Sequence, residues 1–209
     1  MVAAWRGGAT GNQQAVIATL VTFSLLALSI SGSAILTERL GRTWDRLRTT
    51  SLSPLAILAG KAIPAYAVLL AQQAFITGFA MACFGLRVTH PLLLLAVLLT
   101  WSLTLLCLGA LLGMLVASVG ALSASYDIGG MLLSSMGGAL VPLAVLPHWV
   151  RSGASASPGY WVADSMRYAF SGDTRGALLG CLVLAGVAVF CGVLASVRLR
   201  GADGRLAAL

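Results

Sequence analysis

Charged residues are scarce in this chain of 209 residues. Only 9% of its residues are Asp, Glu, Lys or Arg, and 59% are hydrophobic. A typical soluble domain carries about 25% charged residues. Because it has so few polar side chains with which to cover a water-exposed surface, the chain is not an ordinary soluble domain, and it is expected to lie in a membrane.

Residues that perform catalysis or hold metals are also few. The chain has two histidines, His90 and His148, and no cluster of His, Asp and Glu in its sequence. An intramembrane enzyme is disfavoured, because a nucleophile needs a nearby base and no predicted span contains histidine. The phosphate-binding pattern GxxxxGK[ST] is missing, since Gly60-Lys61 is followed by Ala62. We therefore expect no enzyme activity, no metal and no cofactor in this chain.

The four cysteines form no CxxC pair, so they carry no signature of a metal or redox site. All four lie inside predicted membrane spans and are interpreted as small apolar fillers. They are Cys83, Cys107, Cys181 and Cys191.

Long apolar runs are what the chain has in abundance. A helix needs about 20 mostly apolar residues to cross a bilayer. The runs do not alternate as the strands of a barrel would, and helices satisfy their own backbone hydrogen bonds in lipid. The sequence therefore predicts an all-α polytopic membrane protein in which residues 1–209 form one transmembrane domain. Its five predicted spans are residues 13–36, 62–86, 91–118, 128–147 and 176–197.

The net charge of +7 does not indicate nucleic acid, because the basic residues fall between the spans, where they report orientation. With the N-terminus outside, eight basic residues lie on the inner side and five on the outer side. We therefore expect an outside N-terminus and a cytosolic C-terminus. The inner residues are Arg39, Arg42, Arg46, Arg48, Lys61, Arg198, Arg200 and Arg205, and the outer ones are Arg6, Arg87, Arg151, Arg167 and Arg175.

A basic stretch interrupts the first two apolar runs. Leu40, Trp44 and Leu47 are spaced as one face of a helix, which predicts an amphipathic helix over residues 38–50. Pro54 suits the first position of the next helix. Three interpretations of the amphipathic helix remain open at this point. It can be a lever that docks a soluble partner, a loop that only sets topology, or a helix lying on anionic lipid.

Three further features concern the second half of the chain. Gly109 and Gly113 form a GxxxG pattern that predicts a close helix contact. Residues 119–127 are expected to form a short inner turn, with Asp127 favouring the dipole at the start of the fourth span. Residues 148–175 are too polar to span, and their aromatic residues suit short helices that dip into the outer leaflet.

Two separated segments resemble type-2 ABC exporter permeases. Glu38–Leu47 (ERLGRTWDRL) and Leu52–Lys61 (LSPLAILAGK) are similar to the usual ERERGTLERL and TPLSPLEILLGK. Downstream, Gly138–Trp149 (GALVPLAVLPHW), Ser157-Pro158 and Asp164–Arg167 (DSMR) are similar to SG…FFPL..LP.WL, NP and D.LR. Here a serine stands before the proline in place of the usual asparagine, and its hydroxyl is expected to cap the following helix.

The resemblance implies a half-transporter that pairs with itself or with a second permease. Two ABC ATPase subunits, which carry ATP and Mg, would dock beneath the pair. The expected ATPase-coupling residues are Glu38, Arg39, Leu40, Arg42, Trp44, Arg46, Leu47 and Arg48. The expected outer gate, a re-entrant segment, includes Pro142, Pro147, Trp149, Pro158, Asp164 and Arg167.

The resemblance also implies the overall role. The chain is expected to be the permease subunit of an ATP-driven exporter of hydrophobic or amphipathic compounds, similar to drug or antibiotic exporters, in contact with membrane lipid. The alternative is a non-enzymatic membrane scaffold or assembly factor. Permeases of this family usually have six spans, so the chain is expected to lack the first. One lysine against twelve arginines hints at a GC-rich bacterium, and we expect a bacterial cell membrane.

Overall fold

The computed structural model of the chain describes residues 11–26, 32–33, 36–37, 54–86, 88–141 and 146–206. Within these ranges every regular element is a helix, and no strand is present, which confirms the all-α prediction. The elements are α1 (Gly11–Leu26), α4 (Pro54–Phe84), α5 (Pro91–Leu115), α6 (Val119–Met136), α7 (His148–Gly153), the 3₁₀ helix η2 (Ala154–Ala156), α8 (Pro158–Ser171) and α9 (Thr174–Leu206).

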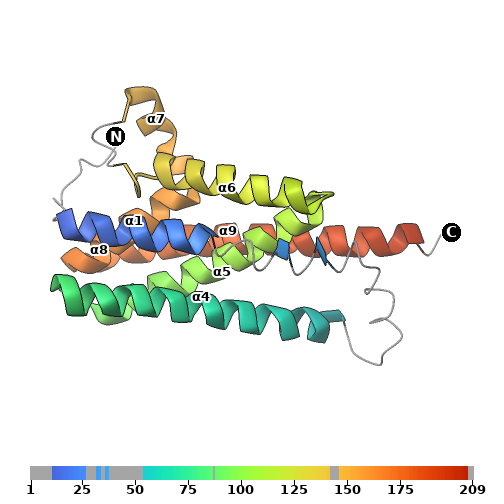
Figure 1. Cartoon of the computed structure of the whole chain (residues 1–209), viewed down its shortest axis with the longest axis horizontal. Helices are drawn as coiled ribbons and strands as arrows, with labels where there is room; N and C mark the ends of the chain where they lie inside the picture. The colour runs from blue at the N-terminus through green and yellow to red at the C-terminus, as the bar shows by residue number, and fades with distance from the viewer. Residues whose placement is uncertain are drawn as a thin grey trace.

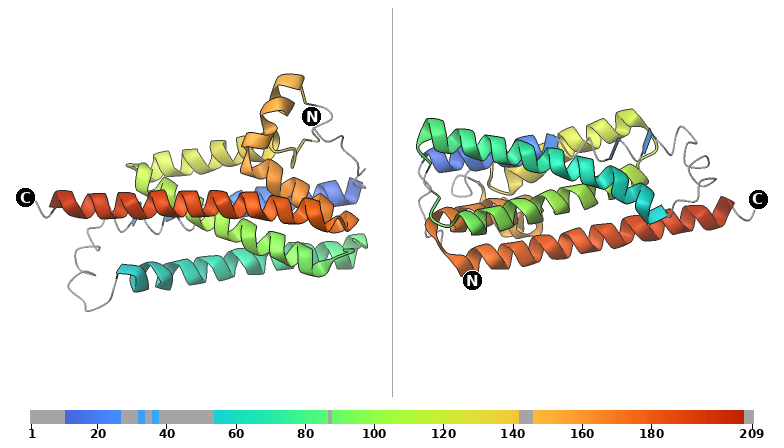
Figure 2. Two further views of the ribbon diagram at one scale, coloured as in Figure 1. Left: turned by 180° about the vertical axis from the view of Figure 1, so that it is seen from behind. Right: turned by 90° about the horizontal axis from the view of Figure 1, so that it is seen from below.

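The longer helices lie side by side as a bundle, with α5 at its centre (Figure 1). Helix α5 contacts α1, α4, α6, α8 and α9, and its most extensive contact is with α9. The start of α1, the end of α4 and the start of α9 lie at one end of the bundle, and the C-terminus lies at the other (Figure 2). Helix α7 projects sideways from the bundle.

Three helical segments in the described ranges are long and apolar enough to cross a membrane. They are Ala62–Phe84, Pro91–Leu115 and Thr174–Arg198, and they agree with the second, third and fifth predicted spans. Helix α1 as described has 16 residues, and α6 has 18 residues with several polar ones. The count of five spans therefore stays a prediction.

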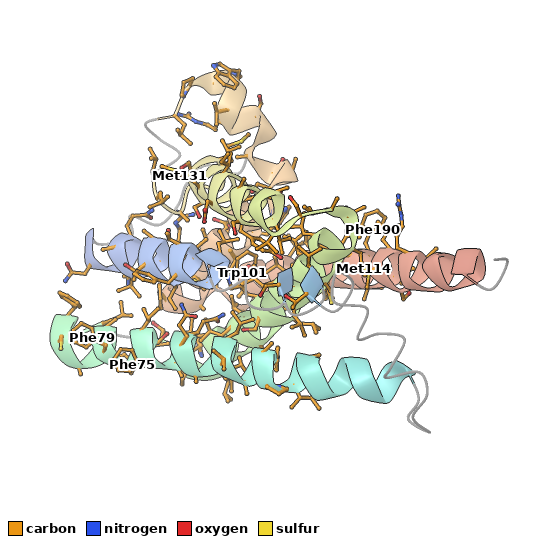
Figure 3. All side chains as sticks on the ribbon, turned by 45° about the vertical axis from the view of Figure 1, so that its right-hand side comes forward. Phe75, Phe79, Trp101, Met114, Met131 and Phe190 are labelled. Carbon is orange, nitrogen blue, oxygen red and sulfur yellow. The ribbon has the colours of Figure 1, made fainter. Side chains whose placement is uncertain are left out.

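Apolar side chains fill the interior of the bundle and also cover much of its outside. Trp101 lies at the centre (Figure 3) and is 1% exposed. Large apolar side chains on the outer faces are exposed, including Phe75 of α4 and Phe190 of α9. A surface with this much exposed apolar area is typical of contact with lipid or another protein chain.

Hydrogen bonds donated by side chains join the helices inside this apolar core. The indole Nε1 of Trp101 donates to Ser24 Oγ of α1 at 2.8 Å. Thr104 Oγ1 donates to the carbonyl of Leu184 in α9 at 3.0 Å. Such bonds between helices are the usual way in which a membrane bundle satisfies its few buried polar groups.

Glycines permit the closest backbone contact of α5. A Cβ atom at Gly113 would lie 2.7 Å from the carbonyl oxygen of Gly32, and one at Gly32 would lie 2.9 Å from the carbonyl oxygen of Gly109 and overlap the Tyr126 hydroxyl. The contact predicted from the GxxxG pattern is therefore confirmed.

Helix α6 differs from the prediction. It begins at Val119, where a turn was expected, and it ends at Met136, near the middle of the predicted fourth span. The hydroxyl of Ser118 caps it by accepting from the Ala121 amide at 3.2 Å, which allows the helix to start early. Asp127 thus lies exposed in the middle of a helix, so its assignment to a helix N-terminus is wrong.

Candidate functional site

The predicted site residues fall in two groups. The eight coupling residues, at positions 38–48, lie outside the described residues, as does Pro142 of the outer gate. The other gate residues lie on α7 and α8 or, in the case of Pro147, directly before α7, in the part of the chain between α6 and α9. The geometry of the site is built from these two helices.

Helix α7 begins directly after Pro147. The carbonyl of Pro147 accepts from the amides of Val150 and Arg151, both at 3.1 Å. Val150 is buried, whereas Trp149 is 74% exposed. The indole of Trp149 therefore faces outward from the projecting part of the molecule.

Helix α8 begins with Pro158, and Ser157 caps it as expected. The Ser157 hydroxyl accepts from the Gly159 amide at 3.2 Å and also approaches the carbonyl of Leu133 in α6 at 3.4 Å. The helix ends at Gly172, which has a φ of +90° and whose amide donates to the Tyr168 carbonyl. A left-handed glycine at this place is a common helix terminator.

The end of α6 lies directly against the start of α8. A Cβ atom at Gly137 would lie 2.6 Å from the Tyr160 amide nitrogen, and one at Gly159 would overlap the Leu133 carbonyl oxygen. The two backbones approach this closely only because both positions are glycine. The contact fixes the turn after α6 next to the first turn of α8.

Arg167 connects three segments that are distant in the sequence. It lies on α8 and is 8% exposed. Its Nη2 donates to the carbonyl of Gly138 at 2.6 Å and to Gln14 Oε1 of α1 at 3.1 Å. Gln14 Nε2 in turn donates to the carbonyls of Ala139 at 2.7 Å and Gly138 at 3.2 Å. We call these residues, together with Asp164, the Arg167 network.

The charge balance of the Arg167 network is set by burial. The nearest oxygen of Asp164 lies 3.9 Å from Arg167 Nη1. Burial raises the pKa of the Asp164 carboxyl, while Arg167 and a hydrogen bond from Tyr168 oppose that shift. Burial also lowers the pKa of the Arg167 guanidinium, opposed by Asp164 and two tyrosines. For both groups the loss of water outweighs the attraction of the partner.

The geometry unites only part of the predicted gate. Asp164 and Arg167 lie together, whereas Pro147, Trp149 and Pro158 shape the helices around them without joining the network. The network also joins α8 to α1 and to the turn after α6, so a movement of any one segment changes its hydrogen bonds. The arrangement therefore suits a structural latch at one end of the bundle.

Sequence reasoning missed Gln14, Gly138 and Ala139 as members of this network. Gly138 and Ala139 contribute carbonyls, which no side-chain pattern reveals. Gln14 lies 153 positions from Arg167, and the only signal for it was a polar amide at the start of an apolar run. Among the described residues, no group of three or more His, Cys, Asp or Glu side chains could hold a metal ion.

Comparison with known families identifies a family whose profile matches the chain. The profile of the family described as ABC-2 type transporter matches residues 3–171, which is most of the chain. Neither the comparison with curated proteins nor that with solved structures found a match.

Proposed function

The chain belongs to the ABC-2 type transporter family, and we propose that it is the permease subunit of an ATP-driven exporter of hydrophobic or amphipathic compounds. Family membership supports the permease role, and such permeases normally work with a separate ABC ATPase subunit. The export direction, the drug-like or antibiotic-like cargo and the pairing of two permeases are parts of the proposal.

The single observation that carries the proposal is the family match over residues 3–171. It includes both the basic segment and the Arg167 network, and three of the described helices are long and apolar enough to cross a membrane. In the proposed mechanism, the ATPase binds residues 38–50 on the cytosolic side. A nucleotide can move the permease only through contacts that differ between states, and the amphipathic segment supplies such contacts.

The Arg167 network is the proposed outer latch. It lies at the end of the bundle where α1 starts (Figure 1), which positive-inside reasoning assigns to the exterior. Its hydrogen bonds hold α1, the turn after α6 and α8 together in the described state. Release of cargo would require these segments to separate. A tilt of α1 driven from the cytosolic side would break the Gln14 bonds first.

Co-purification and charge reversal test this function. The chain should co-purify in mild detergent with a co-expressed ABC ATPase and raise its ATP hydrolysis in liposomes. Arg42→Glu together with Arg46→Glu should abolish that stimulation and efflux while leaving membrane insertion intact. Arg198→Glu together with Arg200→Glu is the matched control, because it reverses two charges elsewhere on the proposed cytosolic side. If the Arg42/Arg46 variant keeps full stimulation, the coupling role is wrong, and a chain that binds no ATPase is better explained as a scaffold.

A further inference from the structure

An open groove lies along the seam between α4 and α5. It has a volume of about 260 Å³, and its lining includes Thr77 and Gly78 of α4 and Leu94 and Leu98 of α5. All the side chains that line it are uncharged, and nearly all are apolar. A bound molecule would therefore meet hydrocarbon along most of its length, and a charged group in the groove would have no counter-charge.

A buried glutamine, Gln73, directly precedes Ala74, which lines the groove. Gln73 is 1% exposed, although it belongs to one of the apolar spans. Thr77, which lines the groove, donates through its Oγ1 to the backbone carbonyl of Gln73 at 2.8 Å. Gln73 Nε2 donates to Ser102 Oγ at 2.9 Å, and Ser102 lies one turn beyond Leu98. The Gln73–Ser102 pair thus bridges α4 and α5 next to the inner end of the groove.

The hydrogen bonds fix the orientation of the Gln73 amide. The Ser102 hydroxyl has one hydrogen, which it donates to the Leu98 carbonyl at 2.8 Å. Ser102 must therefore accept from Gln73, and the amide nitrogen is the atom that faces it. The amide oxygen Oε1 is then buried, and no described residue donates to it. A buried acceptor without a donor is unfavourable in an apolar interior, so it marks a place where a donor can bind.

We propose that the groove between α4 and α5 binds an uncharged amphipathic molecule whose apolar chain lies along the seam and whose terminal hydroxyl donates to Gln73 Oε1. The inference deepens the proposed function, because it assigns the cargo to a class: an apolar chain ending in one neutral hydrogen-bond donor. Phosphate-bearing lipids do not fit, because no charged side chain lines the groove. Binding itself requires neither the ATPase nor ATP.

Photolabelling of the full chain in phosphatidylcholine nanodiscs tests the inference. The probe is a long-chain alcohol with a diazirine in its chain, and the comparison probe is its methyl ether, which lacks the donor. The alcohol should label peptides of α4 and α5 roughly fivefold more than the ether, the ratio expected for one net hydrogen bond. Equal labelling of the unaltered protein by the two probes would overturn the proposal.

Three variants separate the parts of the site. Gln73→Met removes the acceptor at similar volume, so alcohol labelling should fall to the level of the ether. Ser102→Ala removes the bridge and keeps the acceptor, so the preference for the alcohol should remain. Gly78→Leu should lower labelling by both probes, because no atom lies within 4 Å of a Cβ at Gly78 and the added side chain has room to fill the groove.

Opposite results would contradict the proposal. If Gln73→Met keeps the alcohol preference, Oε1 is not the acceptor, and if Gly78→Leu changes neither signal, the groove is not the site. The assay contains no ATPase, so its outcome is independent of the proposed coupling. If the chain selects the alcohol but binds no ATPase, this inference stands and the proposed function is wrong. If it binds the ATPase but does not select the alcohol, the proposed function stands and this inference is wrong.

Discussion

Arg167 of α8 donates a 2.6 Å hydrogen bond to the backbone carbonyl of Gly138, in the turn that follows α6. The same guanidinium nitrogen reaches Gln14 Oε1 of α1. One buried side chain thus holds three segments, and its hydrogen bonds are strong because the donor is charged. The first predictions concern this relationship.

Removing the arginine should destabilise the bundle. Arg167→Ala removes the donor to the Gly138 carbonyl and to Gln14 Oε1, and each hydrogen bond to a charged group contributes about 1.5–3 kcal/mol. For a chain of this size we expect a fall in Tm of about 5–10 °C in detergent. Arg167→Lys keeps the charge and should lie between wild type and alanine, since one ammonium cannot copy the planar fork of a guanidinium.

The matched control for this arginine is Arg151→Ala, because Arg151 is exposed on the neighbouring helix α7. It should change the free energy of unfolding by less than about 0.5 kcal/mol. An equal loss of Tm in both variants would show that the buried arginine contributes no more to stability than the exposed one.

Gln14 should control the order of the turn after α6. Gln14→Glu keeps an oxygen for Arg167 and loses the donor to the carbonyls of Gly138 and Ala139. Hydrogen–deuterium exchange at the amides of residues 138–140 should therefore become faster, because those amides bond only to the end of α6. Asn12→Asp adds the same charge at an exposed position of α1 and should leave the exchange unchanged. Unchanged exchange in Gln14→Glu would contradict this role.

Two glycines should respond in opposite directions to alanine. At Gly113 a methyl group would lie 2.7 Å from the Gly32 carbonyl oxygen, and forcing helices apart costs about 1–3 kcal/mol. At Gly129 of α6 nothing lies within 4 Å, so alanine should stabilise the helix by up to about 1 kcal/mol. Thermal unfolding of the two variants checks the prediction, and a stabilising Gly113→Ala would contradict the packing described here.

The pH dependence of stability should contain a contribution from Asp164. Burial raises the pKa of this carboxyl, so the folded chain keeps a proton that the unfolded chain, with an Asp pKa of about 3.9, releases. The free energy of unfolding therefore falls as pH rises from about 4 through the raised pKa, and it levels off above that value.

Asp164→Asn mimics the protonated form and should remove this slope, as seen in Tm measured between pH 4 and pH 7. Asp127→Asn, at an exposed position of α6, is the control and should keep it. A variant Asp164→Asn with the same slope as wild type would show that another group carries the effect.

Local rules predicted much of the fold from the sequence. Pro54 and Pro91 mark the starts of α4 and α5, Ser157 caps α8, and the GxxxG pattern identifies a close contact. Each of these features depends on a few neighbouring residues. The start of α6 differs from the prediction because its first half is rich in small polar residues, which are typical of turns, whereas the cap at Ser118 allows a helix to begin there.

Contacts between distant segments could not be predicted in this way. Nothing in the sequence pairs Gln14 with Arg167, because the pairing depends on how α8 packs against α1. Gln73 gave a local signal, a glutamine within an apolar run, and its meaning depends on Ser102 of α5. The pairing of polar groups across helices thus required the packed structure.

The most direct test of the central claim is the side of the membrane on which residue 46 lies. A single cysteine at Arg46, in a chain whose four native cysteines are replaced by alanine, is treated with a membrane-impermeant maleimide. The account predicts no labelling in intact cells and strong labelling in inverted vesicles. A cysteine at Trp149, exposed on α7, should show the opposite pattern. Labelling of position 46 from the exterior of intact cells would contradict the account, because no cytosolic ATPase could then reach the coupling segment.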